Sequence, residues 1–208
     1  MKSKTIAPPT FLQTLAVLIT EVIYGKAHFH ITRALKGTRP AIVKTAPTFF
    51  GLAVGAHGDT TALHAARIFD RHSKGASIHA LLALALENAG TFKNATAMEV
   101  RSAVGEARRI VAELEPMLRP IRTRRNETLA HVSARAFVDL ESYFKDGEIS
   151  YRRLGDVFDR TGAVLNQFFY LQTGRTVPLD LAGVNDVENL LKIALESLRG
   201  MAKRPPVR

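Results

Sequence analysis

The sequence contains no cysteine. This absence excludes disulfide bonds and thiol-based catalysis, and it is compatible with a reducing cytosol. The chain also lacks a glycine-rich phosphate loop and any cluster of residues at metal-ligand spacing, so we expect neither a cofactor nor a metal. Polar side chains interrupt its apolar stretch over residues 11–23, and no run reaches the roughly 18 apolar residues of a membrane span. We therefore expect a cytoplasmic protein with no membrane contact.

Positive charge is the most prominent feature of the composition. The 208 residues are 46% hydrophobic and 23% charged, which is typical of a globular protein. Lysine and arginine number 29 against 19 acidic residues, and the formal net charge is +10. Such a surplus favours an anionic partner, most simply a nucleic acid, although charge alone does not distinguish RNA from DNA or lipid.

The spacing of apolar residues predicts an all-α protein. Apolar side chains recur three and four positions apart in nearly every segment, and no segment is convincing as a strand. Thr10 with Gln13 forms an expected capping box, and Glu99 is the expected partner of Asn94 or Thr96. The expected helices span about 10–35, 40–71, 77–89, 94–116, 120–132, 150–174 and 185–202, and a frayed basic tail follows from 203.

Two details of these helices carry structural predictions. Pro116 and Pro120 are expected to end one helix and to begin the next, because proline lacks a backbone donor and disfavours helix at the preceding residue. The helix over 40–71 is expected to bury a stripe of apolar residues and to let a neighbouring helix approach at its glycines. The stripe is Phe49, Leu52, Ala56, Leu63 and Phe69, and the glycines are Gly51, Gly55 and Gly58.

Arginines gather before residue 125. Arg119, Arg122 and Arg124 precede the segment Arg-Asn-Glu-Thr-Leu-Ala-His at 125–131. Near the start of a helix, such arginines and the free backbone N–H groups can both bind phosphate. We expect the three arginines to contact the phosphates of a nucleic acid without base preference.

The segment at 125–131 contains the residue types that metal-free RNA cleavage needs. When the 2′-OH of RNA attacks the neighbouring phosphate, a base must take its proton, and His131 titrates nearest neutral pH. Arg125 supplies a fixed cation for the charge that builds on phosphorus. Asn126 could orient the phosphate or the histidine. An arginine and a histidine six positions apart also occur on ordinary solvated helix faces, which is the alternative interpretation.

Helix geometry constrains this pair. On one helix, Arg125 and His131 would lie roughly 120° apart around the axis and about 9 Å apart along it, so they would not meet at one phosphate. Either the helix begins irregularly near Pro120, or a second copy of the chain completes the site. The second possibility predicts a homodimer with a composite cleft.

The chain resembles the HEPN superfamily, and in particular its AbiU-like, abortive-infection branch. The R-N-x-x-x-A-H segment at 125–131 matches the motif of that branch. Upstream, a helix that ends in residues 65–70 precedes a short leucine-rich helix, as in that branch. Helices that carry Tyr151, Leu154, Phe158 and Phe168 follow the motif, so the resemblance covers roughly residues 10–175.

The resemblance implies an antiparallel helical bundle, usually dimeric, in which the motifs of two protomers meet in a basic cleft. It implies a single domain over 1–208, a core over about 10–175 and an additional helix over about 185–202. It further implies a ribonuclease of a toxin–antitoxin or antiphage system, with Arg125 and His131 as the catalytic pair and an antitoxin protein as a possible partner. Ser133 departs from the tyrosine of toxins controlled by a nucleotidyltransferase, which puts such a partner in doubt.

Two alternatives stand beside this interpretation. Some HEPN domains are non-catalytic, so the chain could instead be a helical module that binds nucleic acid or a protein through the patch from Arg119 to Arg125. Separately, histidines recur at positions 57, 64, 72 and 79, which is conceivable as a metal stripe. Satisfied or exposed histidines are the favoured interpretation of that pattern, because a turn near Gly75 interrupts the helix.

Overall fold

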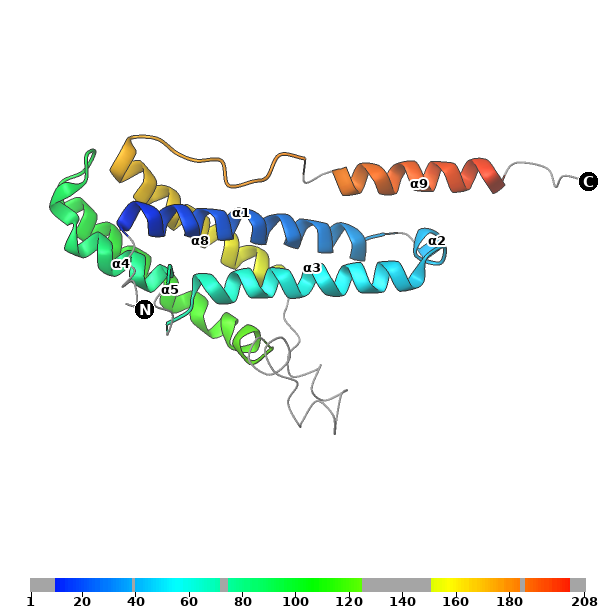
Figure 1. Cartoon of the computed structure of the whole chain (residues 1–208), viewed down its shortest axis with the longest axis horizontal. Helices are drawn as coiled ribbons and strands as arrows, with labels where there is room; N and C mark the ends of the chain where they lie inside the picture. Colours follow the sequence, from blue (N-terminus) through cyan, green and yellow to red (C-terminus); the bar gives the residue numbers. More distant parts are fainter. Residues whose placement is uncertain (1–9, 39, 72–74, 125–150, 184–185, 203–208) are drawn as a thin grey trace, which may run out of the picture.

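A computed structural model describes residues 10–38, 40–71, 75–124, 151–183 and 186–202. The chain is mainly helical over these ranges and contains no strand within them, which confirms the all-α prediction (Figure 1). Its elements are α1 (Phe11–Lys36), α2 (Pro40–Val43), α3 (Pro47–Ile68), α4 (Ile78–Glu87), the 3-10 helix η1 (Ala89–Thr91), α5 (Ala97–Arg124), α8 (Tyr151–Thr173) and α9 (Asp186–Ala202).

Local capping signals fix the starts of three helices. At α1, the Thr10 N–H donates to the Gln13 side chain over 2.9 Å, and the Gln13 N–H donates to the Thr10 hydroxyl, which confirms the expected capping box. The Ser77 hydroxyl accepts a backbone N–H in the first turn of α4. Thr96 caps α5, since its N–H donates to the Glu99 carboxylate over 2.7 Å while its hydroxyl accepts the Glu99 N–H. The partner of Glu99 is therefore Thr96 rather than Asn94.

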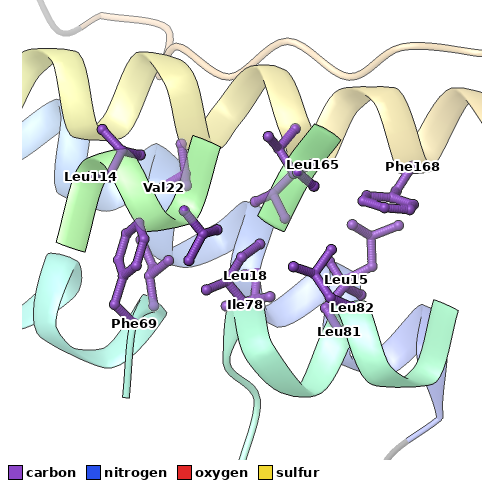
Figure 2. Close-up of a cluster of buried hydrophobic side chains, with 14 of the residues drawn as sticks. Leu15, Leu18, Val22, Phe69, Ile78, Leu81, Leu82, Leu114, Leu165 and Phe168 are labelled. Atoms are coloured by element: carbon purple, nitrogen blue, oxygen red, sulfur yellow. The ribbon is translucent and has the colours of Figure 1, made fainter. Parts of the chain in front are cut away.

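The main hydrophobic core lies between α1, α3, α4, α5 and α8. Figure 1 shows α1 and α3 side by side and antiparallel, with α8 and α5 packed across them. Figure 2 shows the centre of this core, where side chains of α1, α4, α5 and α8 meet Phe69, which directly follows α3. Those labelled are Leu15, Leu18, Val22, Phe69, Ile78, Leu81, Leu82, Leu114, Leu165 and Phe168. Full burial of each large side chain contributes about 1.5–3 kcal/mol, so this cluster accounts for much of the driving force for folding.

α1 and α8 approach each other closely at glycines. A Cβ built on Gly25 of α1 would lie 2.2 Å from Cε1 of Phe158, and one on Gly155 of α8 would lie 3.1 Å from Cζ of Phe29. The sequence predicts close approach at the glycines of the second long helix instead, and this is wrong for two of them. Gly51 and Gly55 have nothing within 4 Å of a built Cβ.

A second, smaller cluster holds α9 against the other end of the bundle. Leu35 of α1, Ile42 of α2 and Phe50 of α3 are buried there, and the apolar face of α9 packs on them. The α9 side chains in the cluster are Val187, Leu191 and Leu195. Figure 1 shows α9 near α2, away from α4 and α5.

The single helix expected over 40–71 is in fact two. α2 ends at Val43, and α3 begins anew at Pro47. Proline disfavours helix at the residue before it, and Ala46 is accordingly non-helical, with φ −151° and ψ 64°. The expected apolar stripe is also partly wrong: Phe50 faces the second cluster, while Phe49 and Leu52 are 63% and 70% exposed. Ala56 is exposed as well, whereas Phe69 is buried as predicted.

The prolines near residue 120 do not divide the chain as predicted. α5 runs without interruption from Ala97 to Arg124 and contains both Pro116 and Pro120. Leu114, Leu118 and Ile121 are at most 1% exposed and continue one buried stripe past both prolines. Their burial offsets the roughly 3 kcal/mol that an interior proline costs a helix.

Candidate functional site

The predicted catalytic residues follow α5 directly. Arg125, Asn126 and His131 lie outside the described residues, as does most of the helix expected over 120–132. Of the arginines expected to bind phosphate, Arg119 has a described side chain, which is exposed. Arg122 and Arg124 belong to the last turn of α5. The described part of the candidate site is therefore the surface of α5 that leads into the motif.

One face of α5 is fixed by burial. Eight of its side chains are at most 6% exposed and pack into the main core, which leaves the remaining faces toward solvent. They are Val100, Ala103, Val104, Ala107, Val111, Leu114, Leu118 and Ile121. This anchoring sets the direction in which every other α5 residue points.

A second face of α5 carries arginines that have no carboxylate partner among the described residues. Arg101, Arg108 and Arg119 lie within about 20° of each other around the helix axis and extend about 27 Å along it. All three are exposed. None of them forms an ion pair with a carboxylate in the part of the chain that the structure describes. We call these three residues the arginine face.

The acidic residues of α5 lie mostly on another side. Glu106 and Glu113 are about 140–160° from Arg108 around the axis. Both bind Arg109, at 2.5 Å and 2.6 Å, so that arginine is neutralised. Glu113 also accepts a hydrogen bond from Arg160 of α8, which holds the pKa of the Glu113 carboxyl below its usual range. The charges of α5 are thus segregated into a paired side and the arginine face.

Among the carboxylates of α5, Glu115 alone lies close to the arginine face, about 20° from Arg108 around the axis. Arg71 donates to both its oxygens, from Nε over 2.8 Å and from Nη2 over 2.5 Å. Nε2 of His79 lies 3.5 Å from the same carboxylate. These groups and Arg108 line a pocket of about 480 Å³, together with Leu82, Val111 and Ala112. The bidentate pair compensates the negative charge at this point of the face.

A histidine cluster lies between α1 and α3. Nδ1 of His28 is 2.7 Å from Nδ1 of His57, and the ring of His28 stacks on that of His64 with centroids 5.8 Å apart. Nδ1 of His64 is in turn 2.7 Å from the Glu21 carboxylate. The short contact between His28 and His57 requires one ring to donate and the other to accept, so at least one of the two is neutral. Burial, with the nearby His57 and His64, lowers the pKa of His28.

The cluster was not apparent from the sequence. The seven-residue spacing of His57 and His64 does place them on one face of α3, but His28 joins them from a helix that is distant in sequence. No group of three or more histidines and carboxylates has the geometry of a metal site within the described ranges. His79, the other described histidine of the 57, 64, 72 and 79 series, lies apart beside Glu115. The histidine cluster is therefore a contact between α1 and α3, and it includes His28, whose pKa is lowered.

The helical fold of the described residues is consistent with a HEPN protein. Residues 21–192 match the family model AbiU2 of HEPN, and this match spans α1 to α9. The chain therefore belongs to the AbiU2 family, a HEPN family related to abortive infection. No match was found among the curated proteins or among the solved structures. No helix in the described part of the chain has the length and apolar character needed to cross a bilayer.

Proposed function

We propose that this protein is a metal-independent endoribonuclease that acts as a toxin or antiphage effector. The observation that carries the proposal is the segment Arg125-Asn126 through Ala130-His131 in a chain of the AbiU2 family. The exposed Arg119 on the helix that leads into this segment is consistent with an RNA partner.

In the proposed reaction, His131 takes the proton of the RNA 2′-OH, and the 2′-oxygen attacks the adjacent phosphorus. The bond from phosphorus to the 5′-oxygen breaks, and the leaving oxygen is protonated. The products are a 2′,3′-cyclic phosphate and a free 5′-OH. Arg125 balances the negative charge that develops on the phosphate oxygens, and its planar fork binds two of them at once. Asn126 orients the phosphate or the imidazole.

The proposal includes a homodimer, because Arg125 and His131 would diverge on a single helix. A two-fold axis beside the motif would bring Arg125 of one chain near His131 of its partner. An antitoxin protein is a further proposed partner, since a ribonuclease without a restraint would damage its own host.

The test is cleavage of RNA by the purified protein in EDTA. Cutting should persist, the product should carry a 2′,3′-cyclic phosphate, and a substrate with deoxyribose at the cleavage site should resist. His131→Ala should lower the rate by about 10²–10⁴ while thermal stability stays nearly unchanged. Arg125→Lys should also fail, since lysine is a point charge that cannot form the bidentate contact.

Two results would overturn this mechanism. An absolute need for Mg²⁺ would do so, and so would cleavage of the deoxy substrate. If the wild-type protein cuts no RNA but binds it through the patch from Arg119 to Arg125, the chain is the non-catalytic module instead. Expression in cells also distinguishes the ribonuclease from the non-catalytic module. If the wild-type protein arrests growth and His131→Ala does not, the toxicity requires the catalytic base.

A further inference from the structure

We propose that the arginine face of α5 binds single-stranded RNA away from the cut, so that Arg101 and Arg108 hold phosphates of the strand whose scissile bond lies at the motif. This inference rests on the proposed function, because it names a second part of the same substrate's path. Neither residue belongs to the patch around Arg119 that the sequence singles out.

The first support is charge segregation along α5. Arg101, Arg108 and Arg119 are exposed, share one face and lack carboxylate partners in the described ranges. An exposed arginine without a partner has the full donor fork available for a phosphate. Arg109 shows the opposite case on the same helix, since Glu106 and Glu113 occupy its guanidinium.

The second support is how Glu115 is compensated. A bare carboxylate on this face would repel an RNA backbone between Arg108 and Arg119. Arg71, which lies just after α3, donates to both oxygens, so the face keeps an excess of positive charge. Arg71 and Arg108 line the same pocket of about 480 Å³, which gives the strand a concave surface beside the face.

The third support is the direction in which the arginine face runs, which is toward the motif. The arginine face follows the axis of α5 for about 27 Å, and α5 ends at Arg124, where the motif begins. A strand whose scissile phosphate lies at the motif would therefore meet Arg119 first and then Arg108 and Arg101. The buried stripe of α5 lies about 90° around the axis from the arginine face, and its packing in the core keeps the Cα atoms of the three arginines in line.

The experiment measures binding of a 2′-O-methyl oligonucleotide that is long enough to span α5 and cannot be cut by 2′-OH attack. Its affinity is followed by fluorescence anisotropy over a range of salt concentrations. Each lost phosphate contact should reduce the salt slope by roughly 0.7, so Arg108→Gln should lower it by about 0.7 and Arg101→Gln/Arg108→Gln by about 1.4. Arg109→Gln is the matched control, because it removes the same charge from the adjacent but paired position and should leave the slope nearly unchanged.

Cleavage provides the second readout. The double variant should cut a dinucleotide at the wild-type rate, because that substrate does not reach Arg108, but it should show a raised KM for long RNA. If the wild-type protein cuts nothing, the proposed function fails, and the binding measurement still tests this inference. Salt slopes equal to wild type in both Arg108 variants would overturn it, and so would an equal loss in Arg109→Gln. An acidic protein would then be the alternative occupant of the face.

Discussion

Gly25 of α1 is a point of close approach to α8. A methyl group there would meet the ring of Phe158, which is fully buried, at 2.2 Å. Overpacking of this kind costs about 1–3 kcal/mol, so we expect Gly25→Ala to lower the free energy of unfolding by that amount. Urea denaturation followed by circular dichroism measures the difference.

Gly55 is the matched control for this substitution. It also lies within a helix, but nothing is within 4 Å of its built Cβ. Gly55→Ala should stabilise the protein by up to about 1 kcal/mol through helix propensity alone. If both alanine variants were equally stabilising, the close contact of α1 with α8 would not exist in solution.

His28 makes stability depend on pH. Its pKa is lowered in the folded protein, chiefly by burial and then by His57 and His64. Between the folded and unfolded pKa values, the unfolded chain therefore binds the proton more tightly. Stability is fully present above the unfolded value of about 6.5 and is lost as the pH falls from there through the folded pKa.

We expect His28→Gln to flatten the decline of the melting temperature below about pH 6.5. The other titratable or charged groups of the cluster stay in place in this variant. They are Glu21, Tyr24, His57, His64 and Arg67. His30→Gln is the control, since His30 packs on Phe29 outside the cluster. A variant with the same acid decline as wild type would show that protonation of His28 does not oppose folding.

At the scale of the helices, α5 shows how packing overrides a local signal. Pro116 is exposed in the interior of α5 and removes one backbone hydrogen bond there. Pro116→Ala should restore that bond and raise the free energy of unfolding by on the order of 1–3 kcal/mol. Thermal denaturation is the measurement.

Pro47 provides the comparison for this substitution. It lies in the first turn of α3, where a backbone N–H has no helical partner in any case. Pro47→Ala should therefore change stability much less than Pro116→Ala. A loss of stability in Pro116→Ala would mean that the proline ring makes contacts that outweigh the missing hydrogen bond.

The same elements show which features the sequence can predict. Helix starts at Thr10, Ser77 and Thr96 follow from hydrogen bonds between residues three apart, so local sequence determines them. The continuity of α5 through its prolines depends on a buried stripe that only the assembled bundle provides. The exposure of Phe49 likewise depends on the break before Pro47, which sets the orientation of α3.

The candidate site likewise has one part that the sequence predicts and another that depends on the assembled bundle. The segment at 125–131 is recognisable from residue types and spacing, because the chemistry demands those types in one place. Prediction of the arginine face requires knowing which side of α5 is buried and which arginines, such as Arg109, have carboxylate partners. The pairs His28–His57 and Arg71–Glu115 join residues 29 and 44 positions apart, and no local pattern predicts them.

At the scale of the whole molecule, the proposed mechanism requires one phosphate to contact both Arg125 and His131. Large apolar side chains such as Phe49 and Leu52 are exposed on α3, so the described surface offers apolar area for association. In a two-fold dimer each site would take Arg125 from one chain and His131 from the other. The arrangement predicts complementation between two inactive variants.

We expect Arg125→Ala and His131→Ala proteins to be inactive alone and to regain activity when their subunits are mixed and allowed to exchange. A heterodimer of the two has one site in which both groups are lost and one in which both are intact. A random one-to-one mixture contains half heterodimers, so it should recover roughly a quarter of the wild-type activity. A double Arg125→Ala/His131→Ala protein mixed with either single variant is the control, because such a dimer contains no intact pair. A wild-type enzyme that sediments as a monomer while it cuts RNA would exclude the composite site, since both groups would then come from one chain.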